Sequence, residues 1–228
     1  MCYILNIETA TTVCSASVSK NGEVLALREL DNGFTHAENL HIFIDSVLKE
    51  AGIRPTELNS IAVSKGPGSY TGLRIGASTA KGMAYALNIP LISVDTLQIM
   101  ASQAQLMQNE QAAMYCGMID ARRMEVYAAI YDQELRPVRA TEALIVTEDS
   151  IEQFNAYTKI FFFGDGMPKC KELLGSLKNA LFIDDVKPSA RHMSALSFER
   201  YSNRQFEDVA YFEPFYLKDF MIKKKAER

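Results

Sequence analysis

The stretch K-G-P-G-S-Y-T-G-L-R-I-G, residues 65–76, decides how the chain around it folds. Pro67 fixes its own φ, and the glycines on either side allow conformations that other residues avoid, so neither a helix nor a strand can run through this point. Residues 71–88 repeat at helical spacing, and Ser69 or Thr71 can accept a hydrogen bond from the first helical turn. The stretch therefore predicts a strand, a sharp turn and a helix.

A glycine-rich turn before a helix can also hold a phosphate, because free N–H groups and the helix dipole favour an anion. The P-loop pattern requires Gly-Lys-Ser/Thr before the helix, where this sequence has Tyr70-Thr71-Gly72. The dinucleotide pattern would need its last glycine one position before Gly72, so the helix would be rotated. We interpret the turn as tight and as allowing close packing of the following helix, and phosphate binding remains the alternative.

Composition indicates a globular protein of 228 residues with 48% hydrophobic residues, enough for one large domain or two small ones. No apolar run approaches the roughly 18 residues that span a bilayer, and the N-terminus lacks the basic flank of a signal peptide, so we expect a cytoplasmic protein. The four cysteines have no C-x-x-C spacing, which favours reduced, mostly buried thiols. A net charge of −4 argues against broad nucleic-acid binding, although the tail at 218–228 is basic and is interpreted as solvated.

Hydrophobic spacing in the first half predicts an α/β fold. Asn21-Gly22 is a strong hairpin signal because both residues tolerate positive φ. Thr35 and Glu38 have the spacing of a capping box, and Thr96 can cap a third helix that ends near residue 108. The other expected elements are strands at 3–8, 13–19 and 24–30, a helix at 37–51, a strand at 60–64, a helix at 71–88 and a strand at 91–94, in the order β-β-β-α-β-α-β.

The second half begins like the first, with an apolar strand at 113–120 that ends in an acid, Asp120, as the strand at 3–8 ends in Glu8. This weak repeat predicts two related lobes. We expect an N-terminal lobe at 1–108 and a smaller, degenerate second lobe with the C-terminal tail at 109–228. Arg122 and Arg123, in the turn after Asp120, could pair with an anion, but pairing with carboxylates of the same fold is the favoured interpretation, so Arg122→Ala should lower the melting temperature.

Further elements of the second half follow from the same patterns. We expect strands at 125–131 and 159–163, a helix at 169–177, a helix near 189–204 that packs back on the first lobe, and an aromatic segment at 211–220 that docks on the body of the protein.

Several motifs carry a resemblance to a known family. They are N-I-E-T-A at 6–10, T-H-A-E-N-L at 35–40, the glycine-rich stretch at 65–76, D-A-R-R-M-E-V-Y at 120–127 and P-F-Y-L at 214–217. Two lobes that each open with a hairpin after an acid-tipped strand resemble the actin, hexokinase and Hsp70 superfamily, which has the ASKHA, ribonuclease H-like fold. Over nearly its whole length, the sequence resembles the TsaB (YeaZ) family.

The resemblance implies a non-catalytic partner that binds and activates TsaD. TsaD transfers a threonylcarbamoyl group to N6 of adenosine 37 in tRNAs that read codons beginning with A. The resemblance also implies that the ATPase TsaE joins the complex, that tRNA is contacted only through the complex, and that the chain forms a homodimer when alone. No cofactor and no membrane are implied.

Catalytic chemistry has little support in the residues themselves. His36 and His41 are five positions apart, roughly 140° around a helix, and His192 is remote, so no shared metal site is expected. The turns after Glu8 and Asp120 contain no glycine, and no G-x-S-x-G motif is present. An actin-like ATPase or a kinase of small molecules remains the alternative function.

The helix at 71–88 carries two apolar stripes, and a single sheet cannot cover both. One consists of Leu73, Gly76, Ala77, Ala80, Met83, Ala84 and Leu87, and the second of Ile75, Thr79, Gly82 and Ala86. Small residues allow another helix to approach closely, so the second stripe is either core or a partner surface. The resemblance, in which the two N-terminal helices form the partner contact, implies partner-binding residues at Tyr70, Leu73, Arg74, Ile75, Thr79, Gly82, Ala86, His41 and Asp45.

Overall fold

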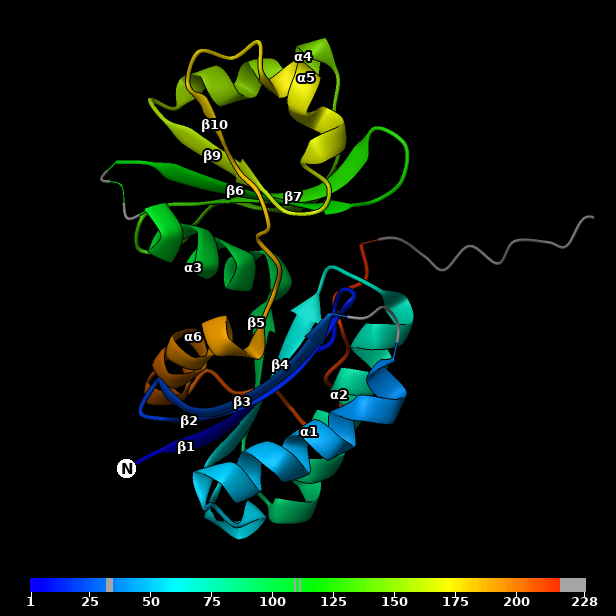
Figure 1. Ribbon diagram of the computed structural model, residues 1–228, viewed down its shortest axis with the longest axis vertical. Coiled ribbons are helices and arrows are strands. Elements are labelled where there is room, and N and C mark those ends of the chain that lie inside the picture. Colours follow the sequence, from blue (N-terminus) through cyan, green and yellow to red (C-terminus); the bar gives the residue numbers. More distant parts are fainter. Residues whose placement is uncertain (32–34, 109, 111, 218–228) are drawn as a thin grey trace, which may run out of the picture.

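Two five-stranded sheets organise the chain in the computed structural model, which describes residues 1–31, 35–108, 110 and 112–217 (Figure 1). The first sheet has the order β3-β2-β1-β4-β5. Its strands are β1 (Tyr3–Glu8), β2 (Val13–Lys20), β3 (Glu23–Asp31), β4 (Ser60–Gly66) and β5 (Leu91–Asp95).

The second sheet has the order β10-β9-β6-β7-β8. Its strands are β6 (Met114–Asp120), β7 (Glu125–Tyr131), β8 (Pro137–Ile145), β9 (Ile160–Phe163) and β10 (Ala180–Ile183). In both sheets the central strand begins an antiparallel three-strand run on one side and pairs with parallel strands on the other. The predicted class, α/β with two actin-like lobes and an initial order β-β-β-α-β-α-β, is confirmed.

Helices cover both faces of the first sheet. The helices are α1 (His36–Ala51), α2 (Tyr70–Leu87), α3 (Thr96–Gln108), α4 (Glu148–Ile151), α5 (Lys171–Leu174) and α6 (Ala190–Ser202). The parallel register sets Leu5 beside Ile61, and both pack under α1 and α2. Ile4 points to the opposite face and packs with Met193 of α6. This alternation explains why β1 is buried on both sides.

α3 packs on the second sheet and against α6, so these two helices lie between the sheets (Figure 1). Leu97 and Met100 of α3 join Tyr115 and Phe163 of the second sheet in one core cluster. The opposite face of that sheet is covered by α4, α5 and two short 3-10 segments, Glu152–Ala156 and Pro168–Cys170. A further 3-10 segment, Pro55–Glu57, lies between α1 and β4. Among the residues described, no helix combines the length and apolarity needed to cross a bilayer.

The segment after α6 returns to the first sheet. Glu207 donates its N–H to the Leu91 carbonyl at 2.8 Å, Phe212 is buried in the core, and Phe215 donates to the Lys65 carbonyl at 2.7 Å. The expected docking is therefore confirmed as far as residue 217. Residues 218–220 and the basic tail lie outside the described residues.

Several local predictions need correction. Thr35 precedes α1, but its side chain makes no capping hydrogen bond, so the capping box is absent. Thr96 is the first residue of α3 rather than a cap, because β5 runs directly into the helix. The helix expected at 169–177 is split into a 3-10 turn and the four-residue α5. All four cysteines are unpaired and buried, as predicted.

Candidate partner-binding face

The central glycines bring α2 against the turn between β1 and β2. A Cβ atom added to Gly68 would lie 2.2 Å from the Ala10 carbonyl oxygen, and one added to Gly72 would lie 2.1 Å from the Thr9 carbonyl oxygen. The N–H of Ser69 donates to the Ala10 carbonyl at 2.6 Å. The turn is thus filled by the chain's own carbonyl groups, which supports close helix packing over a phosphate cradle.

Ser69, not Thr71, caps α2. Its hydroxyl accepts a hydrogen bond from the N–H of Gly72 at 3.3 Å. The hydroxyl of Thr9 donates to the Gly72 carbonyl at 2.8 Å, so side chains as well as backbone join the turn to the helix. The beginning of α2 is therefore fixed relative to β1.

Glu8, at the end of β1, is completely buried beside this turn. Its Oε1 accepts hydrogen bonds from the Ala10 N–H at 2.5 Å and the Ser64 hydroxyl at 3.0 Å. Burial raises the pKa of Glu8 to about 7, despite these hydrogen bonds. The free energy of unfolding therefore depends on whether the Glu8 carboxyl group carries a proton.

Glu8 is expected to make the protein less stable as pH rises from its ordinary pKa of 4.5 to about 7. In this window the folded state retains a proton that the unfolded state releases, so stability falls with pH and then levels off above the folded pKa. Above the folded pKa, the free energy of unfolding is lower by on the order of 3 kcal/mol. Urea unfolding at pH 5 and pH 8 should show this loss, and Glu8→Gln should remove most of it. An unchanged pH dependence in Glu8→Gln would contradict the assignment.

The turn after Asp120 corrects the prediction for Arg122 and Arg123. Both side chains are exposed, and neither forms an ion pair with any residue that the structure describes. Lys169 is the ion-pair partner of Asp120, and it also donates to the Glu125 carbonyl at 2.6 Å. The contacts give no reason for Arg122→Ala to lower the melting temperature.

The three histidines lie in different surroundings. His36 is buried, with Nε2 2.8 Å from the Thr11 carbonyl oxygen, whereas His41 is exposed on α1 and His192 lies on α6. Within the described ranges, no group of three or more His, Cys, Asp or Glu side chains could hold a metal ion. His36 is therefore part of the packing between α1 and the β1–β2 turn.

The two stripes of α2 have different environments. The first is largely buried, and Leu73 is only 1% exposed, so its assignment to the partner surface is wrong. The second stripe runs from half-buried Ile75 and Thr79 to exposed Gly82 and Ala86. A Cβ atom at Gly82 would have no atom within 4 Å. The end of the second stripe at Gly82 and Ala86 is therefore not core of the described chain, whereas Ile75 packs against the core of the first sheet.

The exposed residues of α2 carry little charge. Every residue of this helix is described, and Arg74 is the one charged residue among Thr71, Arg74, Ser78, Gly82, Tyr85 and Ala86, which are its exposed positions. Lys81 is half-buried and donates to the carbonyls of Ala210 and Phe212. A solvent-facing helix usually carries more charge, and a glycine inside it costs about 1 kcal/mol relative to alanine.

α1 lies beside α2 on the same side of the first sheet (Figure 1). It exposes His41 and Asp45, and Asp45 pairs with Lys49 at 2.6 Å. Two large apolar residues that the sequence did not single out are also exposed, Ile42 at 61% and Tyr85 at 82%. We call the exposed residues of these two helices the α1–α2 face.

Tyr70 and Arg74 lie at the beginning of this face. The Arg74 guanidinium carbon is 4.3 Å from the centre of the Tyr70 ring, and that ring is 5.1 Å from the ring of Tyr216. Cation–π and aromatic contacts therefore join the start of α2 to the C-terminal segment.

Comparison with known proteins identifies the class. Residues 33–221 match the family described as TsaD, tRNA N6-adenosine threonylcarbamoyltransferase. The chain is 30% identical over 229 residues to the tRNA threonylcarbamoyladenosine biosynthesis protein TsaB of Escherichia coli (strain K12), covering 97% of each chain. The protein of the same name from Haemophilus influenzae is 29% identical over 235 residues, covering 97% of this chain and 96% of that one.

The structural comparison agrees. YeaZ from Pseudomonas aeruginosa has a TM-score of 0.80 and 26% identity, covering 95% of this chain and all of that chain. The chain therefore belongs to the TsaB (YeaZ) group within the TsaD family.

Proposed function

We propose that this chain is a non-catalytic subunit that binds and activates TsaD during the formation of threonylcarbamoyladenosine in tRNA. The observation that carries the proposal is the α1–α2 face, which is nearly uncharged on α2 and open around Gly82. The names of the relatives, which place them in threonylcarbamoyladenosine biosynthesis, support the pathway. Helix-on-helix packing of small residues supplies the mode of contact.

The residues proposed to contact TsaD are Tyr70, Arg74, Ile75, Thr79, Gly82, Ala86, His41 and Asp45. The same face would hold a homodimer when TsaD is absent. TsaE would join through the complex, and tRNA would reach this chain only there. The two lobes are proposed to divide at residue 108, with α6 packing back on the first.

A reconstituted assay tests this function. TsaD, TsaE, tRNA and threonylcarbamoyl-adenylate are incubated with and without this chain, and modified adenosine is measured. We expect modification to depend on the chain, and immobilised chain to retain TsaD. Full modification without the chain, or no retention of TsaD, would refute the proposal.

We also predict that the isolated chain binds neither nucleotides nor metal ions. Carbonyl groups fill the turn between β1 and β2, and at the turn between β6 and β7 Lys169 already pairs with Asp120. Calorimetric titration with MgATP, zinc or ferrous iron should show no saturable heat at micromolar concentration. Saturable ATP binding would instead favour the actin-like ATPase or kinase.

A further inference from the structure

A cavity of about 270 Å³ lies between the two sheets, and none of the described residues that line it belongs to α1 or α2. Lys65 and Asp95 border it at the carboxyl ends of the parallel strands β4 and β5, and Arg200 reaches it from α6. Tyr131 of the second sheet and Phe215 of the C-terminal segment supply aromatic walls. Crevices beyond the carboxyl ends of parallel strands are common ligand positions.

The side chains that line the cavity include two cations, Lys65 and Arg200, and one carboxylate, Asp95. Glu199 and Glu207 act on Arg200 from outside the lining. Lys65 Nζ is 3.4 Å and Arg200 Nη2 is 3.7 Å from the same oxygen of Asp95, Oδ2. Both distances are longer than those of a close charge-assisted hydrogen bond. Within the lining, two cations thus share one carboxylate loosely, so both can still contact a ligand oxygen.

Arg200 is held in place but not fully hydrogen-bonded. Its Nη2 donates to Gln98 Oε1 at 2.7 Å, and Gln98 Nε2 donates to the Leu135 carbonyl at 2.9 Å. Its Nη1 is buried and has no hydrogen-bond partner among the residues that the structure describes. Because Nη1 is inaccessible to solvent, Arg200 borders the cavity through the rest of its guanidinium, whose planar geometry matches a carboxylate.

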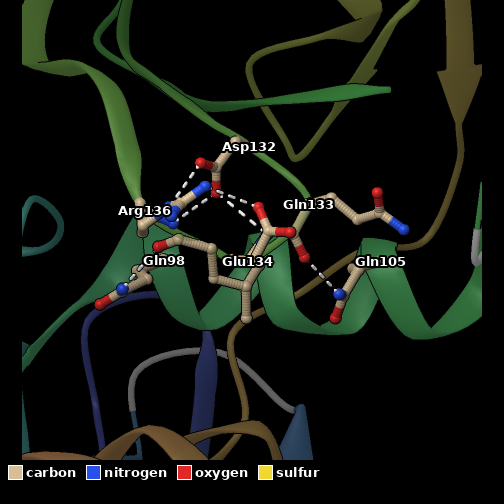
Figure 2. A network of polar contacts seen from close by, with 7 residues as sticks. Gln98, Gln105, Asp132, Gln133, Glu134 and Arg136 are labelled. Atoms are coloured by element: carbon tan, nitrogen blue, oxygen red, sulfur yellow. Dashed lines mark hydrogen bonds and ion pairs between the residues drawn. The ribbon is translucent and has the colours of Figure 1, made fainter. Parts of the chain in front are cut away.

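The wall of the cavity next to Gln98 is rigid. Figure 2 shows the turn between β7 and β8 seated on α3, with Arg136 paired to Asp132 at 2.7 Å and to Glu134 at 2.8 Å. Gln105 also donates to the Gln133 carbonyl at 2.6 Å. These contacts fix the Leu135 carbonyl that orients Gln98, so the position of Arg200 is set before any ligand arrives.

We propose that this cavity binds a small organic monoanion whose carboxylate is held by Arg200 and Lys65. The volume corresponds to roughly nine water molecules, which suits a metabolite of modest size. Tyr131 and Phe215 would contact a short apolar body. The site is distinct from the α1–α2 face and does not depend on the function proposed above.

Benzoate and its neutral analogue benzamide, titrated into the full chain by NMR or calorimetry, test the proposal. Benzoate should bind saturably at millimolar concentration and shift the Gln98 side-chain amide signal, and benzamide should bind at least about tenfold more weakly. A parallel titration with inorganic phosphate tests whether the site binds a different kind of anion. If phosphate binds and benzoate does not, the carboxylate assignment is wrong.

Two variants and a control locate the site. Arg200→Gln should weaken benzoate binding about ten- to a hundredfold, whereas Asp95→Asn should strengthen it, because both cations then face the ligand. Lys187→Gln, which removes a surface cation paired with Asp31, should leave binding unchanged. Absence of saturable binding, or an Asp95→Asn variant that binds more weakly, would overturn the proposal. If Arg200→Gln does not fold, Asp95→Asn alone decides.

Discussion

Gly82→Arg is expected to abolish association with TsaD and leave the fold intact. Gly82 is exposed, and no atom lies within 4 Å of the position its Cβ would take, so the chain itself tolerates a side chain there. A partner helix resting on this glycine would meet a long charged side chain. Overpacking and the burial of a charge should together cost about 3 kcal/mol or more, or at least roughly a hundredfold in affinity.

Three measurements separate the outcomes for Gly82→Arg. Circular dichroism and the melting temperature should match the unmodified chain, gel filtration should show a monomer, and immobilised variant should fail to retain TsaD. Glu199→Arg, an exposed change on α6, is the matched control and should bind TsaD normally. The proposed face is wrong if the folded Gly82→Arg chain still retains TsaD, or if the variant cannot fold.

Gly72→Ala and Gly82→Ala are expected to change stability in opposite directions, although both add one methyl group to α2. At Gly72 the new Cβ would lie 2.1 Å from the Thr9 carbonyl oxygen, a contact that only backbone movement can relieve. We expect a loss of about 3 kcal/mol, or roughly 6–12 °C in melting temperature. At Gly82 the methyl group meets no atom, so the higher helix propensity of alanine should add about 1 kcal/mol.

Thermal and urea unfolding of the two variants measure this contrast directly. Equal effects at the two glycines would mean that helix propensity alone governs the change. That outcome would contradict the close fit of α2 against the β1–β2 turn.

The first half of the fold could be predicted because its signals are local and strong. Asn21-Gly22 defines a hairpin, and the stretch at 65–76 forces a turn between β4 and α2. The second half was harder. β8 is an edge strand with mostly polar or exposed residues, and β10 has only four residues, so neither showed a clear pattern.

The candidate face was only partly readable from the sequence. Helical spacing separated the stripe of Gly82 from the buried stripe that contains Leu73, and it was the resemblance, not the spacing, that placed Leu73 on the partner surface. Tyr85 belongs to neither stripe, and spacing alone did not indicate that this large side chain is exposed. Its exposure depends on the elements that flank α2, which include the C-terminal segment. The charge partner of Asp120 is Lys169, 49 positions away, and sequence spacing gave no indication of it.

The oxygen atoms that meet Gly68 and Gly72 belong to the main chain of Ala10 and Thr9. Every residue type carries such a carbonyl group, so exchanging either residue leaves the oxygen in place. An exchange of the Thr9 or Ala10 side chain therefore leaves the contacts at Gly72 and Gly68 in place, although it can remove the Thr9 hydroxyl that faces Gly76. A change in the number of residues between β1 and β2 would move these carbonyl groups, so the length of this loop is a heritable feature that keeps the turn closed at Gly68 and Gly72.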